Sequence, residues 1–61
     1  MNDYMEAYIK NTITYLKTFE ASLRMAALKN DGNIDRHEQK IIDKANKLTD
    51  KYVSELERLI D

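Results

Sequence analysis

The sequence predicts an all-α protein: an antiparallel two-helix hairpin that dimerises into a four-helix bundle. Three observations lead to this prediction. The 61 residues contain no proline and one glycine, Gly32, near the middle of the chain, so nothing else interrupts two long helices. Both halves carry apolar residues at helical spacing. Together the two apolar arcs are too wide to be enclosed by one helix pair, which favours a second copy.

The first helix is expected over residues 3–28, with an apolar arc of roughly 180°. Its candidates for an oligomer interface are Met5, Ile9, Ile13, Leu16, Phe19 and Leu23. Its candidates for partner binding are Tyr4, Tyr8 and Tyr15, along one edge of the arc, and Met25, on the polar side near the turn. Tyrosines at such an edge are rim residues with buried rings and wet hydroxyls, or they lie at a partner contact. An exposed methionine is an adaptable contact.

A turn is expected over residues 29–35. Asn30, Asp31, Gly32 and Asn33 are turn-forming residues, and Gly32 suits the positive φ that follows a helix. Asp35, followed three residues later by Glu38, has the spacing of a capping box that starts the next helix.

The same segment resembles the second half of an EF-hand calcium loop. With Gly32 at the sixth loop position, the resemblance makes Asp31, Asn33, Asp35 and Glu38 candidate metal ligands. The first half departs from the pattern, because Ala27 and Lys29 occupy its first and third positions. Alanine cannot coordinate an ion and lysine places a positive charge beside it. We therefore expect a structural turn, with no metal and no cofactor, and keep weak divalent-metal binding as an alternative.

The second helix is expected over residues 36–60, with an apolar arc of roughly 140°. Its candidates for the oligomer interface are Leu48, Tyr52, Leu56 and Leu59. Its polar surface is sorted by sign. The acidic residues are Asp43, Asp50 and Glu57, and the basic residues are Arg36, Lys40, Lys44, Lys47, Lys51 and Arg58. Pairs such as Glu6 with Lys10 and Glu20 with Arg24 have the spacing that supports a helix.

Two helices alone cannot bury both arcs, and a two-helix structure is marginal in water. A homodimer is the simplest closed solution, since the same surface then meets itself. A bundle formed with another protein satisfies the same physics.

Composition argues against several functional classes. An enzyme is not expected, because the chain has no cysteine, one histidine and no glycine-rich phosphate loop. No stretch approaches the roughly 20 apolar residues that cross a bilayer. The N-terminal segment carries Asp3 and Glu6 where a signal peptide would be basic, so we expect a cytoplasmic protein. Neither a membrane nor a small-molecule substrate is expected as a partner.

The expected function is therefore a non-catalytic interaction module: a small regulator, adaptor or inhibitor that acts through protein contacts and self-association. The alternative is an RNA- or DNA-binding hairpin. It would use Lys10, Lys17 and Arg24 on the first helix and the basic stripe from Arg36 to Arg58 on the second. In length and topology the chain resembles repressor-of-primer hairpins, a resemblance that implies a dimeric four-helix bundle and RNA binding. Small hairpins of this type are often bacterial or phage regulators.

Overall fold

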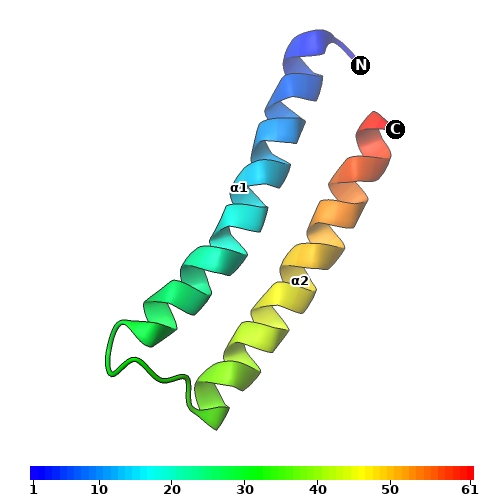
Figure 1. The fold of residues 1–61 in the computed structure, drawn as a ribbon. Coiled ribbons are helices and arrows are strands. Elements are labelled where there is room, and N and C mark those ends of the chain that lie inside the picture. The colour runs from blue at the N-terminus through cyan, green and yellow to red at the C-terminus, as the bar shows by residue number, and fades with distance from the viewer.

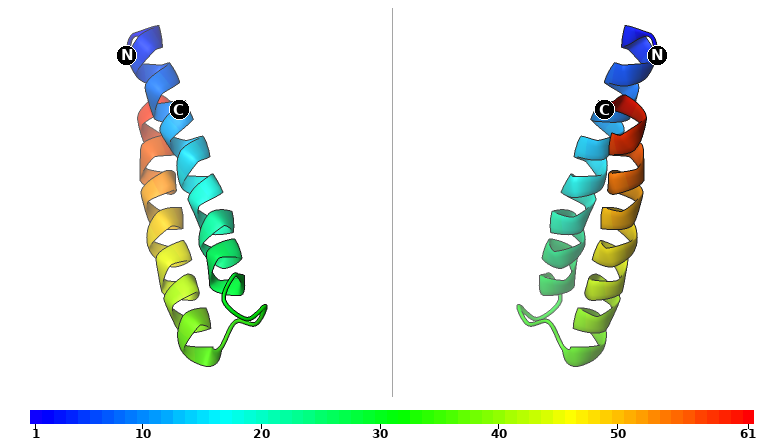
Figure 2. Two further views of the ribbon diagram at one scale, coloured as in Figure 1. Left: turned by 90° about the vertical axis from the view of Figure 1, so that its left-hand side faces the viewer. Right: turned by 90° about the vertical axis from the view of Figure 1, so that its right-hand side faces the viewer.

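The computed structural model describes residues 1–61 and contains two helices and no strand. Helix α1 (Asp3–Leu28) and helix α2 (Arg36–Ile60) run antiparallel and are joined by a turn over residues 29–35 (Figure 1). The predicted hairpin is confirmed. The molecule is long and thin, with extents of 46 × 17 × 9 Å, and both termini lie at the end opposite the turn (Figures 1 and 2).

Both helices begin at a side-chain cap. The Asn2 Oδ1 atom accepts a hydrogen bond from the Met5 amide at 2.8 Å at the start of α1. At the start of α2 the Glu38 amide donates to Asp35 Oδ1 at 2.7 Å, and the Asp35 amide donates to Glu38 Oε1 at 3.1 Å. This pair confirms the predicted capping box, which satisfies two amides that lack partners within the helix.

Local hydrogen bonds also build the turn. Gly32 has φ of 77°, and its amide donates to the Leu28 carbonyl at 2.9 Å, which closes the end of α1. A Cβ at this position would meet no atom within 4 Å, so the positive φ, not crowding, favours glycine. The Asn33 amide donates to Asp31 Oδ1 at 3.0 Å, as in an Asx-turn. Ile34, the apolar residue of the turn, is half-buried.

The two helices meet along residues spaced alternately three and four apart, the pattern of a coiled-coil contact. We call this set the interhelix interface. It comprises Glu6, Ile9, Ile13, Leu16, Glu20, Leu23 and Ala27 on α1, and Gln39, Ile42, Asn46, Thr49, Val53, Leu56 and Ile60 on α2. Only Ile13, Ile42, Thr49 and Val53 are buried, so the core of the hairpin is small. Thr49 is satisfied because its hydroxyl donates to the Ala45 carbonyl at 2.8 Å.

Polar side chains interrupt this interface near its middle. Glu20 Oε2 and Asn46 Oδ1 are shielded from solvent and accept no hydrogen bond. The expected ion pair of Glu20 with Arg24 does not form; the one ion pair within 4.0 Å is that of Lys10 with Glu6, at 3.4 Å. A side-chain hydrogen bond with Asp50, which forms only when one of the two carboxyl groups holds a proton, raises the pKa of Glu20; partial burial and the charge of Asp50 also raise it, while Lys17 lowers it. Since two carboxylates cannot hydrogen-bond without a proton, this contact favours the protonated acid.

Replacing Glu20→Gln should stabilise the hairpin at pH 7, because the amide removes the repulsion of two carboxylates and still offers a donor to Asp50. A raised pKa means that the folded state binds the proton more tightly, so the wild type gains stability as pH falls from 7 toward about 4.3. The advantage of the variant should therefore shrink over that range. Melting temperatures measured across this range, with Glu57→Gln as an exposed control, check the prediction. An advantage that does not vary with pH would contradict it.

Replacing Asp35→Ala should destabilise the hairpin by about 1 kcal/mol, because the capping oxygen at the start of α2 is lost. Asp35→Asn keeps a capping oxygen and should lose only part of that stability. The free energy of unfolding from urea titrations compares the two variants. Equal losses in both would mean that the charge of Asp35, and not its capping hydrogen bond, stabilises the helix.

Candidate interaction surface

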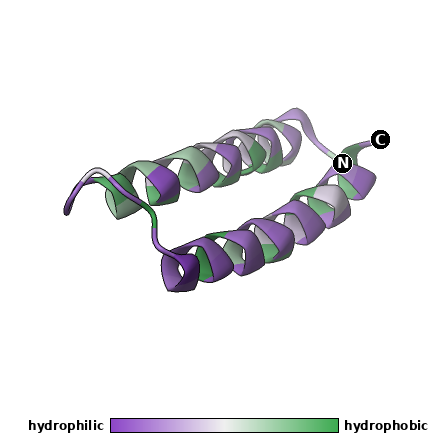
Figure 3. Ribbon diagram, turned by 60° about the horizontal axis from the view of Figure 1, so that its bottom comes forward, coloured by the Kyte–Doolittle hydropathy of each residue, from purple (hydrophilic) through white to green (hydrophobic).

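Large apolar side chains remain exposed on both helices. Eight of them form what we call the apolar face: Met5, Tyr8, Tyr15 and Phe19 on α1, and Ile41, Leu48, Tyr52 and Leu59 on α2. Exposure ranges from 41% at Phe19 to 76% at Tyr8, so these side chains are far from buried. Hydrophobic segments recur along both helices between hydrophilic ones (Figure 3).

The position of these residues in the sequence explains why they share one side of the hairpin. Each directly precedes a residue of the interhelix interface, as Tyr8 precedes Ile9 and Ile41 precedes Ile42. One residue turns a helix by about 100°. The helices are antiparallel, so they turn in opposite senses when both are viewed from the same end. Moving from an interface residue to the residue before it therefore turns clockwise on one helix and counterclockwise on the other. Both rows therefore turn to the same side.

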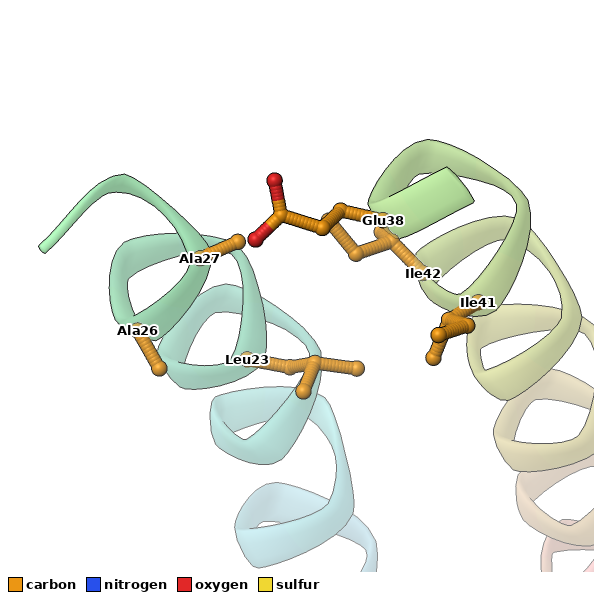
Figure 4. Close-up of a pocket in the computed structure, with 6 residues that line it drawn as sticks. All are labelled: Leu23, Ala26, Ala27, Glu38, Ile41 and Ile42. Atoms are coloured by element: carbon orange, nitrogen blue, oxygen red, sulfur yellow. The ribbon is translucent and has the colours of Figure 1, made fainter. Parts of the chain in front are cut away.

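A shallow cavity near the turn supports this arrangement. It has a volume of about 260 Å³ and is lined by Leu23, Ala26, Ala27, Glu38, Ile41 and Ile42 (Figure 4). Ala26 and Ile41 belong to the rows that precede the interface, and they border the same hollow from the two helices. The Glu38 carboxylate extends from α2 toward Ala27 (Figure 4), and its Oε1 atom already accepts from the Asp35 amide. The apolar face is thus continuous across both helices at this end.

The two long edges of the apolar face differ in charge. The residues two positions before every second interface residue lie at these edges, at seven-residue spacing. On α1 they form an uncharged edge of Tyr4, Asn11, Thr18 and Met25. On α2 the same positions hold His37, near the turn, and a basic edge of Lys44, Lys51 and Arg58. All of these residues are exposed, and Tyr4 reaches 90%.

The opposite side of the hairpin is charged. Its rows directly follow every second interface residue, so the same rotation turns them away from the apolar face. We call this the charged face: Lys10, Lys17 and Arg24 on α1, and Asp43, Asp50 and Glu57 on α2. Opposite signs on adjacent helices attract, although exposed charges contribute little each. The hairpin is therefore a plate with one apolar and one charged side.

The residues proposed for an oligomer interface divide into two sets. Ile9, Ile13, Leu16, Leu23 and Leu56 lie in the interhelix interface, where they are buried or half-buried. Met5, Phe19, Leu48, Tyr52 and Leu59 lie on the apolar face.

The candidates for partner binding are all exposed. Tyr8 and Tyr15 belong to the apolar face, and Tyr4 and Met25 belong to the uncharged edge. Ile41 also lies on the apolar face but was not among the residues predicted from the sequence. Its position directly before Ile42, within the apolar arc of the second helix, could have indicated it.

The candidate metal ligands of the turn are engaged by the backbone. Asp31 and Asp35 each accept from an amide, and Glu38 accepts from the Asp35 amide. The Asn33 side chain donates to the Asp31 carbonyl at 3.3 Å. No group of three or more histidine, cysteine or acidic residues could hold a metal ion.

Taken together, the residues of the predicted basic stripes do not lie in a single row along either face of the hairpin. Lys10, Lys17 and Arg24 lie beside the acidic row of the charged face. On α2 the row of the charged face begins at Arg36 and continues with acidic residues, whereas Lys40 and Lys47 follow the interface residues Gln39 and Asn46 and lie further round the helix. Lys40, Lys44 and Lys47 surround a shallow hollow with Asp43, whose Oδ1 atom accepts from Gln39 Nε2 at 2.8 Å.

Comparison with known proteins identified no similar protein, so the proposed function is argued from the surface of the hairpin. No family model matches the chain, and no match was found among curated proteins or among solved structures. Neither helix has the length and apolar character needed to span a membrane.

Proposed function

We propose that this protein is a non-catalytic interaction module that self-associates, with the apolar face of one hairpin packed on that of a second copy. The result would be a four-helix bundle whose charged faces point outward. The observation that carries the proposal is the apolar face itself: eight large side chains, from both helices, on one side of a thin hairpin. Monomeric proteins rarely leave such a continuous surface in water.

The dimensions of the hairpin support a second layer. Its radius of gyration is 14.4 Å, whereas a compact chain of this length is expected near 10.5 Å. Its accessible surface is 5199 Å², compared with about 4,100 Å² for a compact monomer of its mass. The single hairpin therefore buries less surface than a typical folded protein of its size.

The area of the apolar face suits a stable interface. If each of its side chains exposes about 100 Å², the face offers on the order of 800 Å². That is the area which one partner contributes to a standard protein interface, about 800 Å². The rows directly before the interface also hold Thr12, Ser22, Ala26 and Ala45, and their only charged residues are Glu38, near the turn, and Glu55. Small and uncharged neighbours let two such faces approach closely.

The chemistry of the face also supports a contact role. Tyrosine, phenylalanine and methionine are enriched at protein interfaces, and here they dominate the α1 side. The cavity near the turn is apolar, and its one carboxylate, Glu38, is held by a backbone amide. Such a hollow offers a substrate no set of converging polar groups. A role as regulator, adaptor or inhibitor would then use the outward charged faces to contact another protein.

Sedimentation tests the self-association directly. The wild type should sediment with twice the mass of the 7.2 kDa chain at micromolar concentration, and its melting temperature should rise with concentration. Leu48→Lys, which places a charge within the apolar face, should weaken association by 100-fold or about 3 kcal/mol. Ser54→Lys, exposed on the other side of α2, is the matched control and should remain dimeric. A stable wild-type monomer at this concentration would refute the proposal.

A second candidate function, nucleic-acid binding, is favoured by one observation. Lys40, Lys44 and Lys47 gather around a surface hollow, and none of them makes an ion pair. Free ammonium groups at this spacing suit contacts to phosphates.

Binding of a short RNA hairpin at low salt should then weaken steeply as salt rises, because counterions are released on binding. Lys44→Glu combined with Lys47→Glu should reduce binding, whereas Lys10→Glu, on the charged face, should have less effect. Fluorescence anisotropy over a salt series measures all three proteins. No change in anisotropy at low salt would remove this candidate.

A further inference from the structure

We infer that the two hairpins associate with their turns at the same end, so that α1 of one copy packs against α2 of the other. This inference rests on the proposed self-association and concerns how the second copy is oriented. The occupant of the apolar face is thus a second copy of this chain, and the charges along the two edges of the face determine its direction.

Two-fold symmetry allows two ways to place one apolar face on another with the helices aligned. If the axis runs along the helices, both turns lie at one end, and each α1 faces an α2 of the other copy. If the axis crosses the helices, the turns lie at opposite ends, and each helix faces its own counterpart. The first arrangement places the basic edge beside the uncharged edge. The second places the two basic edges side by side.

The edge residues occupy the flanking positions of the new helix contacts, comparable to the positions beside the core of a coiled coil. In the opposite-end arrangement Lys44, Lys51 and Arg58 would lie beside the same row of the other copy. Like charges at such positions disfavour pairing. No acidic residue belongs to either edge.

In the same-end arrangement the basic edge lies beside Tyr4, Asn11, Thr18 and Met25 of the other copy. These side chains bring no opposing charge, and their apolar parts can cover the long stems of lysine. Tyr4 and Arg58 both lie near the termini, where the exposed ring would meet a guanidinium of the second copy. This arrangement also gives a contact to Tyr4, the most exposed of the large apolar residues.

The distance between the turns of the two copies distinguishes the two arrangements. Since the chain has no cysteine, Asn30→Cys provides a single exposed site for a spin label in the turn. In the same-end dimer the labels would be separated by the spacing of facing helices, about 10 Å, plus their own arms. In the opposite-end dimer they would approach the 46 Å length of the hairpin. Pulsed dipolar spectroscopy measures this distance.

A label at Thr14→Cys, near the middle of α1, is the control. It should report similar distances in both arrangements, and so shows whether any dimer forms. No dipolar coupling at either site would refute self-association itself. Coupling at Thr14→Cys with a long turn-to-turn distance would refute only the same-end arrangement.

Charge substitution on the uncharged edge gives a second, independent readout. Asn11→Glu combined with Thr18→Glu should tighten the same-end dimer about fivefold at low salt, because each glutamate would face the basic edge of the other copy. In the opposite-end dimer the same glutamates would face each other and weaken it. Asn11→Gln combined with Thr18→Gln is the uncharged control. An affinity that is unchanged or lower, relative to this control, would overturn the inference.

Discussion

A single constraint underlies this structure: each helix carries two adjacent apolar rows, but a hairpin has only one interface in which to bury them. The row that includes Ile13 and Val53 is buried between the helices. The row directly before it, which includes Tyr15 and Tyr52, remains in water. Because the hydrophobic effect is proportional to the area removed from water, this second row is the largest unused source of stabilisation in the chain.

The antiparallel direction of the helices converts this one-dimensional pattern into two different surfaces. Residues directly before the interface collect on one side, and residues directly after it collect on the other. Leu48, Thr49 and Asp50 illustrate the rule, since they are successively an exposed apolar residue, a buried interface residue and an exposed acid. The apolar face, the charged face and the difference between the two edges therefore follow from a single register between α1 and α2. A change of that register would redistribute all of them.

The parts of the fold that could be predicted from the sequence are those that depend on local sequence patterns. The bounds of both helices, the turn at Gly32 and the capping box of Asp35 with Glu38 agree with the structure, because each depends on residues close in sequence. The division of the apolar arcs was not predictable in the same way, because a helical wheel does not say which part of an arc the other helix covers. Glu20 shows the same limit. Its spacing suggested a pair with Arg24, but the contact with α2 turns it toward Asp50.

The polar interruption at Glu20 and Asn46 connects the interior of the hairpin to the proposed assembly. Oxygen atoms without partners in the middle of an interface cost stability, so the contact between α1 and α2 is weaker than its length implies. The half-buried Leu16 and Leu23 lie beside the rows of the apolar face, and a second hairpin on that face would complete their burial. In the proposed dimer, stability would thus come mainly from the contact between copies. Folding and association would then be one process, and the concentration of the chain would set how much of it is folded.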